Sequence, residues 1–394
     1  MNIMIKIIIF SIFFLQSIVF SQGQRVMFEQ LIEKKGLVYI TKEKKPYSGR
    51  VFDNYKSKGR KFSGSYLNGK KHGQWTYWRD NGKMHKEESY FKGKKNGNWT
   101  IYNDDGFKEK TEKYQKDKNT GHLISYHING KRKNEQFLLK DMREGKWTSW
   151  YDNGKIEKEE FYSKNKKVGK WVYHSINGNK ESIISYKNDK RDGKSIYYAS
   201  NSMKVEREES WRSGVENGLW LWWNQNGIKL REGSYRNGQK HGLWITYNDK
   251  GDKVEESQWK DGNLYGKSTV FYINGTKSML KSYKDDEKDG LWVWWNESGR
   301  KVKEGTFKSG EKNGKWTFFH PNGKKKRIEN YSLGNKAGKH IVWYENGQKQ
   351  REESYKNNQK DGKWIYWFDN GRLEKEEKFQ NGIQTDGRHY DYFD

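Results

Sequence analysis

Aromatic, charged and turn-forming positions recur along this chain with a period of about 24 residues. A glycine opens a short apolar run in each period, and these glycines are Gly49, Gly73, Gly97, Gly121, Gly145, Gly169, Gly193, Gly218, Gly242, Gly266, Gly290, Gly314, Gly338, Gly362 and Gly387. Of the fourteen intervals, twelve are equal and two, Gly193 to Gly218 and Gly362 to Gly387, are one residue longer. A repeat this regular predicts one small structural unit stacked on copies of itself.

Each repeat predicts a β-hairpin. Counting from the glycine as position 0, Trp stands at +2 in nine repeats and an aromatic residue stands at +5 in most, which is typical of a strand. Asn-Gly follows at +8 and +9, as in Asn81-Gly82, and predicts a type I′ turn because both residues tolerate positive φ. A charged segment such as Lys86-Glu87-Glu88 then ends in an aromatic residue at +17, and it predicts a second, largely solvated strand. A second loop, such as residues 68–73, leads to the next repeat.

The stacked hairpins predict an all-β fold. A lone hairpin is barely stable in water, so each repeat must pack on its neighbours. We expect an elongated array of about fifteen 24-residue hairpins, about 30 strands, in a twisted single-layer antiparallel sheet. Alternation along a strand places +2 and +4 on one face and +3 and +5 on the other, so both faces carry apolar side chains. The array covers 46–394, and 22–45 form a lead-in or cap.

Four repeats between the first and the last lack the tryptophan at +2. They carry Leu123, Ser195, Ser268 and His340 instead, and the first three lie three repeats apart, as do the last two. This spacing suggests a higher-order period of about 72 residues from duplication of three-repeat blocks. The segment from Gly387 to the last residue is a shortened repeat that would cap the array.

The N-terminus resembles a secretory signal peptide. Lys6 supplies a positive charge, residues 7–20 are mostly apolar, and Val19-Phe20-Ser21 suits cleavage after Ser21. The alternative is an uncleaved membrane anchor, since the apolar stretch is nearly long enough to span a bilayer. We therefore assign 1–21 as a signal peptide and expect an exported protein in the periplasm, on the cell surface or in the medium.

Composition narrows the class of partner. Apolar residues make up 32% and charged residues 33%, but regularly placed aromatic residues at 16% argue against disorder. The net charge is +27, or +26 after removal of 1–21 with its single Lys6, and favours anionic partners. The alternative is a merely well-solvated composition rich in Lys and Asn. The absence of cysteine excludes disulfides and thiolate metal sites.

Catalytic patterns are missing from the sequence. The nine histidines form no cluster with carboxylates, and residues 285–290 lack the alternating ligands of a calcium loop. Glu-Glu pairs recur in most repeats and so belong to the repeat, whereas an active site is a departure from it. No phosphate-binding loop precedes a helix. We predict a protein that is not an enzyme, with no cofactor and no metal.

The repeat resembles the MORN repeat. Gly-x-Trp-x-x-aromatic, Asn-Gly-Lys, Glu-Glu-x-Tyr and Asn-Gly-x-x-x-Gly carry the likeness, which residues 218–242 show well and which covers about 46–394. It is most similar to the bacterial variant of YwqK-like antitoxins, although the usual MORN repeat is one residue shorter. The resemblance implies a hairpin array for protein interaction and oligomerisation, phospholipid or membrane association, or neutralisation of a toxin.

We expect a binding surface in which aromatic and basic residues alternate. Its candidate members are Trp222, Trp223, Trp294, Trp295, Trp343, Trp367, Lys324, Lys325, Lys326 and Arg327. Lysine-rich turns, including Lys70-Lys71 and Lys94-Lys95, should line one edge of the array beside them. The alternative places the tryptophans in the core and the lysines in solvent. The expected partner is a protein, with anionic glycan or lipid as the alternative; nucleic acid is disfavoured and oligomerisation is left open.

Overall fold

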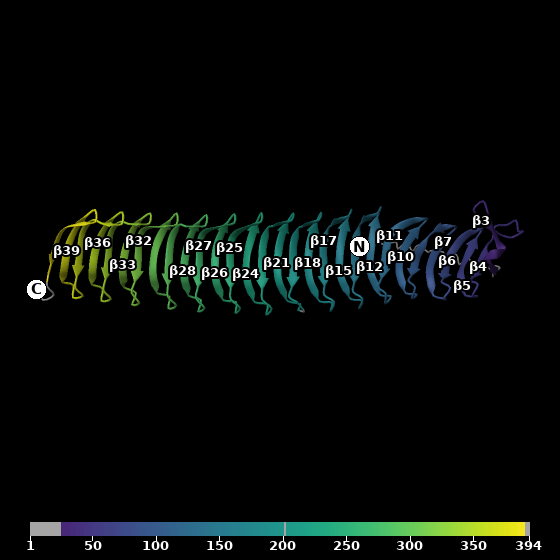
Figure 1. Ribbon diagram of the computed structural model, residues 1–394, viewed down its shortest axis with the longest axis horizontal. Coiled ribbons are helices and arrows are strands. Elements are labelled where there is room, and N and C mark those ends of the chain that lie inside the picture. Colours follow the sequence, from purple (N-terminus) through teal and green to yellow (C-terminus); the bar gives the residue numbers. More distant parts are fainter. Residues whose placement is uncertain (1–24, 201, 391–394) are drawn as a thin grey trace, which may run out of the picture. The chain divides into compact units, whose positions relative to one another are not determined.

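The computed structural model describes residues 25–200 and 202–390. Residues 1–21, which the sequence assigns to a signal peptide, lie outside the described residues. The described residues divide into two compact parts, one comprising 25–157 and 162–165 and the other 158–161, 166–200 and 202–390, so that the division falls within one strand. Within each part the strands of the large sheet lie side by side in a single layer (Figure 1). Among the described residues the one helix is a short 3₁₀ turn, η1 (Phe28–Gln30).

The first part begins with short elements that precede the repeats. The strand β1 (Arg25–Met27) pairs in parallel with β4, whereas the remaining strands of the sheet pair antiparallel with their neighbours. A separate hairpin is formed by β2 and β3. The strands of this part are β2 (Leu31–Lys34), β3 (Leu37–Ile40), β4 (Gly49–Asn54), β5 (Arg60–Leu67), β6 (Lys70–Trp78), β7 (Met84–Phe91), β8 (Lys94–Lys95), β9 (Gly97–Tyr102), β10 (Lys108–Gln115), β11 (Lys118–Tyr126), β12 (Arg132–Leu139), β13 (Met142–Arg143) and β14 (Gly145–Trp150).

The second part repeats the same antiparallel pairing to its end. The two parts divide within β15 (Ile156–Ser163). The following strands are β16 (Lys166–Lys167), β17 (Gly169–His174), β18 (Lys180–Lys187), β19 (Lys190–Arg191), β20 (Gly193–Tyr198), β21 (Val205–Arg212), β22 (Val215–Glu216), β23 (Gly218–Trp223), β24 (Lys229–Arg236), β25 (Gln239–Tyr247), β26 (Lys253–Lys260), β27 (Asn263–Phe271), β28 (Lys277–Lys284), β29 (Glu287–Lys288), β30 (Gly290–Trp295), β31 (Lys301–Lys308), β32 (Glu311–Phe319), β33 (Lys325–Ser332), β34 (Asn335–Lys336), β35 (Gly338–Trp343), β36 (Lys349–Lys356), β37 (Gln359–Lys360), β38 (Gly362–Trp367), β39 (Leu373–Gln380) and β40 (Ile383–His389).

The all-β hairpin array is confirmed, but the type I′ turn predicted at Asn-Gly lies in the second loop of the repeat instead. At Asn81-Gly82 only the glycine has positive φ, and the amide of Gly82 donates to the carbonyl of Arg79. This is a type I turn followed by a left-handed glycine, a three-residue hairpin loop. Type I′ geometry lies instead at the second loop, where Asn68 and Gly69 both have positive φ. The Asn-Gly prediction was wrong because Asn81 folds its side chain onto the amide of Lys83, which fits a type I turn.

The two longer intervals have different origins. Trp211 pairs with Gly193 just as Tyr235 pairs with Gly218, so the extra residue of that repeat lies in the preceding loop and Trp211 takes the ordinary +17 place. At the other interval Gly387 pairs with Glu377, which is the partner of Trp364 on the opposite side of β39. The prediction that Gly387 opens a repeat is therefore wrong. Gly387 occupies the +2 position, where other repeats carry tryptophan, in the last strand.

Candidate functional site

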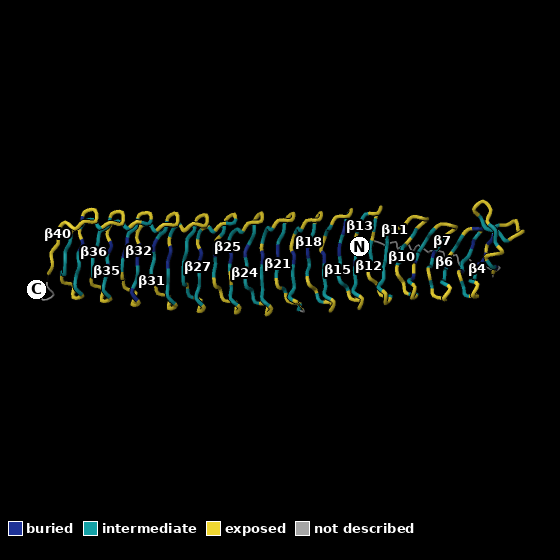
Figure 2. The backbone as a smooth tube through the Cα atoms, in the orientation of Figure 1, coloured by how far each residue is buried: buried dark blue, intermediate teal, exposed yellow. Residues whose placement is uncertain are grey.

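One face of the sheet carries a ladder of aromatic rings. We call it the tryptophan face, and it comprises positions +2, +4, +13, +15, +17 and +22 of each repeat. The +17 ring lies between the +2 ring of its own repeat and that of the next, as Phe307 does between Trp292 at 5.3 Å and Trp316 at 5.0 Å. Burial is concentrated along the middle of the strands, and both turn edges are exposed (Figure 2). The ladder is the core of this single-layer fold, because the aromatic side chains bury one another.

Basic side chains cover these rings. The +22 residue places its cation over the ladder, and the ammonium of Lys312 lies 4.7 Å from the ring centroids of both Trp316 and Tyr331. Lys71 and Lys95 do the same over Trp75 and Trp99. Such cation–π contacts gain strength as the cation loses water, and burial lowers the pKa of Lys71. The prediction that Lys70-Lys71 and Lys94-Lys95 line an edge is therefore partly wrong, because the second lysine of each pair packs on the rings.

The charged strand is not the solvated strand that the sequence predicted. The second glutamate of the Glu-Glu pair, at +15, points into the tryptophan face, and Glu88 is 4% exposed. Lys86 lies 2.7 Å from one carboxylate oxygen and Tyr90 donates to the other at 3.0 Å. Burial acts to raise the pKa of Glu88, but the hydrogen bonds from Lys86 and Tyr90 outweigh it and lower that pKa. Burial and this carboxylate together raise the pKa of Tyr90.

Three repeats carry glycine at +15 instead of glutamate. A Cβ on Gly233 would lie 2.0 Å from the Trp244 ring, and one on Gly305 would lie 2.1 Å from Trp316. The bare backbone lets the next tryptophan lie directly on the strand, and Gly64 does the same beneath Trp75. This packing also brings the +4 ring into contact, at 5.9 Å between Trp222 and Trp244.

Two five-ring clusters result, and corresponding rings lie three repeats apart. The first comprises Trp211, Trp220, Trp222, Tyr235 and Trp244. The second comprises Tyr283, Trp292, Trp294, Phe307 and Trp316, and Phe318 adjoins it at 6.5 Å from Trp316. The three-repeat period inferred from the +2 exceptions thus corresponds to a recurring packing arrangement within the second part.

The opposite face carries a ladder of ion pairs. It comprises positions +1, +3, +5 and +14, and the first glutamate of the Glu-Glu pair stands here at +14. In several repeats a lysine at +1 pairs with it, as Lys194 does with Glu208 and Lys339 with Glu352, both at 2.7 Å. Three repeats carry an apolar residue at +1 instead. Leu219, Leu243 and Leu291 stand there and are 49%, 44% and 45% exposed.

The ion-pair ladder survives in the three leucine repeats. Their glutamates, Glu232, Glu256 and Glu304, pair with lysines at +11, at 2.9, 3.0 and 2.8 Å. The leucines are therefore not needed for pairing, and their exposure gives them little part in the core. Beside them on the same face lie the half-buried +5 rings of Trp223, Tyr247 and Trp295. We call Leu219, Leu243 and Leu291 the leucine stripe.

The candidate tryptophans of the sequence analysis lie on two faces. Trp222 and Trp294 belong to the five-ring clusters of the tryptophan face, whereas Trp223, Trp295, Trp343 and Trp367 stand at +5 on the opposite face. All six are half-buried. They do not form one surface, because neighbouring residues in a strand point to opposite sides.

The candidate basic run is also divided. Lys324 lies in the turn and donates to the carbonyl of Asn346 in the next turn at 2.9 Å. Lys325 and Lys326 are exposed, whereas Arg327 lies 4.3 Å over the Phe318 ring on the tryptophan face. This run belongs to the Asn-Gly edge, and Lys70 and Lys94 to the other edge, so they do not line one edge as predicted. The leucine stripe was missed, although leucine in place of lysine at +1 is visible in the sequence.

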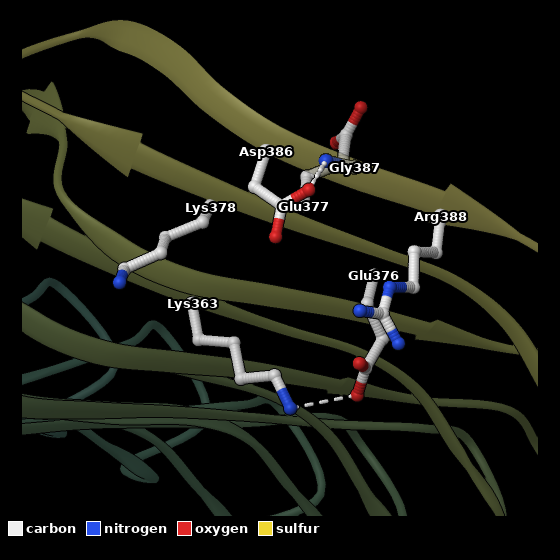
Figure 3. Close-up of a pocket in the computed structure, with 7 residues that line it drawn as sticks. All are labelled: Lys363, Glu376, Glu377, Lys378, Asp386, Gly387 and Arg388. Carbon is white, nitrogen blue, oxygen red and sulfur yellow. Dashed lines mark hydrogen bonds and ion pairs between the residues drawn. The ribbon is translucent and has the colours of Figure 1, made fainter.

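A charged pocket lies at the last hairpin (Figure 3). It measures about 360 Å³ and is lined by Lys363, Glu376, Glu377, Lys378, Asp386, Gly387 and Arg388. Its Lys363–Glu376 pair, at 2.7 Å, repeats the ion-pair ladder of the opposite face. Among residues 25–200 and 202–390, no group of three or more His, Cys, Asp or Glu side chains is arranged to hold a metal ion. No helix within these residues is long and apolar enough to cross a membrane.

The fold and the ladder define a β-hairpin repeat protein. The MORN repeat variant model matches six segments, 71–92, 143–164, 216–237, 312–332, 336–357 and 360–381, which lie in both parts of the chain. The chain is therefore a MORN-repeat protein. The matched model does not single out the YwqK-like variety.

Other comparisons add little. No curated protein matches the chain. Among solved structures, a crystal structure of TcdB2-TccC3 is 8% identical, with 86% of this chain and 27% of that chain covered and a TM-score of 0.18. The Tc holotoxin pore of Photorhabdus luminescens with the mutation TccC3-D651A is 11% identical, with 81% and 19% covered and a TM-score of 0.17. The chain spans about a quarter of the length of the former, and these TM-scores are too low to support a conclusion about this protein.

Proposed function

We propose that this protein is a non-enzymatic interaction module that binds a protein partner through the leucine stripe. MORN repeats in general favour an interaction role. The observation that carries the proposal is the replacement of Lys by Leu219, Leu243 and Leu291 at +1, while the glutamates beside them remain paired. Exposed apolar side chains that do not serve the core are typical of an interface.

The partner we propose has an apolar patch bordered by carboxylates. The stripe and its half-buried +5 rings supply an apolar centre, and Lys194 and Lys315, at +1 of the flanking repeats, supply a basic border at its two ends. Lys267 lies within the stripe, between Leu243 and Leu291. Interfaces commonly combine an apolar core with a polar rim, and charge complementarity selects the partner. The leucines stand at the same position of nearby repeats, so several weak contacts act together.

The test compares two triple variants of the chain in partner capture. Leu219→Lys, Leu243→Lys and Leu291→Lys convert the stripe to the residue that other repeats carry at +1. The matched control is Leu139→Lys, Leu333→Lys and Ile383→Lys, which changes exposed apolar residues elsewhere by the same charge. We expect a protein retained by wild type and control through a physiological-salt wash to be lost from the stripe variant. Equal retention by both variants would contradict the proposal.

A second candidate function is electrostatic binding of an anionic glycan or lipid. The binding surface would be the edge of the sheet formed by the second loops of the repeats, opposite the Asn-Gly edge. Exposed lysines follow one another along this edge in the first part, at Lys92, Lys94, Lys116, Lys118, Lys140 and Lys164. Such binding should weaken steeply between low and physiological salt, because exposed charges are screened. Binding to heparin or anionic vesicles that does not change with salt would argue against it.

We also propose that the protein is exported after cleavage near Ser21, as its N-terminal pattern suggests. N-terminal sequencing of the protein recovered from the producing cells tests this directly. A chain that still begins at Met1 would overturn it.

A further inference from the structure

The tryptophan face contains a ring-sized niche in the Gly97 repeat. It measures about 180 Å³ and lies over Ile101 of β9, between β7 and β10. Ile101 stands at +4, where many other repeats carry an aromatic ring, and it is 44% exposed. A protein cavity of about 150 Å³ lined by apolar groups is large enough to bind benzene.

Lysines flank the niche on both sides. In the strand register Ile101 lies directly between Lys86 of β7 and Lys110 of β10. Each ammonium is held by the +15 glutamate of its own strand, Lys86 by Glu88 at 2.7 Å and Lys110 by Glu112 at 2.6 Å. Trp99 also lines the niche with its half-buried side chain, and Glu87 and Thr100 contribute to the lining as well.

Three other repeats show which group belongs between two such cations. The residue between Arg207 and Arg231 is Trp222, the residue between Lys303 and Arg327 is Phe318, and the residue between Arg351 and Lys375 is Tyr366. A cation lies over each of these rings, at 5.5, 4.3 and 5.2 Å from the centroid. The repeat therefore provides its own template for the niche, a flat ring packed beside cations.

The Gly338 repeat shows that the absence of an aromatic residue at +4 does not by itself create a niche. Val342 there also lies between two cations, Arg327 and Arg351, in the strand register. Its side chain is buried, at 8% exposed, whereas Ile101 is 44% exposed. The Gly97 repeat thus combines a missing ring, paired lysines on both sides and an open space above Ile101.

We propose that the niche over Ile101 binds an aromatic side chain of a partner polypeptide, which takes the place of the missing +4 ring. Indole is the preferred ring, since cations bind the face of Trp best, followed by Tyr and Phe. This inference rests on the proposed interaction role but uses residues of the first part and the other face. A small-molecule probe tests it independently of the leucine stripe.

The experiment measures saturation transfer by NMR from the full chain to N-acetyl-tryptophanamide, with N-acetyl-leucinamide as the aliphatic comparison. We expect transfer to the indole protons in wild type and its loss in Ile101→Tyr, which supplies the ring that Tyr77 supplies in the preceding repeat. Ile128→Tyr, at a turn residue that is 75% exposed, is the matched control and should keep the transfer.

Two further results decide the proposal. Filling the niche should also raise the melting temperature of Ile101→Tyr above that of Ile128→Tyr. If Ile101→Tyr does not fold, Lys110→Gln replaces it, and the loss of one cation should weaken binding several-fold. Absence of transfer in wild type, unchanged transfer in Ile101→Tyr or in Lys110→Gln, or equal transfer to the leucine probe would overturn the proposal. If the indole binds but the stripe variant still captures its partner, the niche stands and the stripe does not.

Discussion

Glycine repeats and glutamate repeats fill the tryptophan face in two different ways. Where +15 is glycine, as at Gly305, the next tryptophan lies flat on the backbone and joins a five-ring cluster. Where +15 is glutamate, as at Glu88, a carboxylate occupies the same place and is held by Lys86 and Tyr90. Within the hairpin the backbone pairing is the same in both, with Trp292 opposite Gly305 and Trp75 opposite Glu88. The same strand pairing thus accommodates either a tryptophan ring packed on glycine or a glutamate that is paired with lysine and tyrosine.

The largest expected effect is the removal of a ring that lies on glycine. Trp316 is 2% exposed, so Trp316→Ala should lower the free energy of unfolding by about 3–5 kcal/mol in urea denaturation. Trp99 in the Gly97 repeat is only half-buried, and Trp99→Ala should cost distinctly less. Equal losses would mean that the glycine packing adds nothing.

The next effect comes from adding one carbon beneath that ring. Gly305→Ala places a Cβ 2.1 Å from Trp316, and displacing the ring should cost about 2–3 kcal/mol by the same measurement. Gly59→Ala is the control, because a Cβ there would meet no atom closer than 3.7 Å. A Gly305→Ala protein as stable as wild type would show that the ring moves without cost.

A smaller effect is expected when the buried glutamate of a glutamate repeat loses its charge. Glu88→Gln should cost about 1–2 kcal/mol at neutral pH, because the buried site loses charge-assisted hydrogen bonds. The folded-state pKa of Glu88 is lowered, so its stabilisation is present above the unfolded pKa and is lost as pH falls through the folded one. Wild type and variant should therefore converge on acidification below about pH 4. Exposed Glu109→Gln should show neither effect.

The smallest effect lies in alkaline solution. Burial, with Glu353 beside it, raises the pKa of Tyr355 to about 12. A raised tyrosine pKa stabilises the fold below the unfolded value near 10, and this contribution is lost as pH rises toward 12. Tyr355→Phe should thus lose less stability than wild type between about pH 10 and pH 12. Unfolding followed by circular dichroism at several pH values measures this. A variant with the same alkaline decline would show that Tyr355 does not carry it.

Much of the fold could be read from the sequence, since so short and regular a repeat leaves few alternatives. Trp at +2, the aromatic residue at +17 and the turn residues predicted the hairpin correctly, because these local preferences agree from repeat to repeat. The Asn-Gly turn type was not predictable from two residues, since Asn81 also stabilises a type I turn by its side chain. Strand alternation already assigns Trp222 and Trp223 to opposite faces, but which rings pack together, as Trp222 does with Trp220 and Trp244, depends on contacts between strands.

The sequence by itself determined the repeat, the hairpin and the side of the strand on which each position falls, because these depend on local periodicity. Only the tertiary structure decided which side chains meet across neighbouring strands. It buried Glu88 between Lys86 and Tyr90, laid Trp316 on Gly305 and left a niche over Ile101 between two lysines. These contacts join residues on different strands, and the register that sets them is fixed when the hairpins pair.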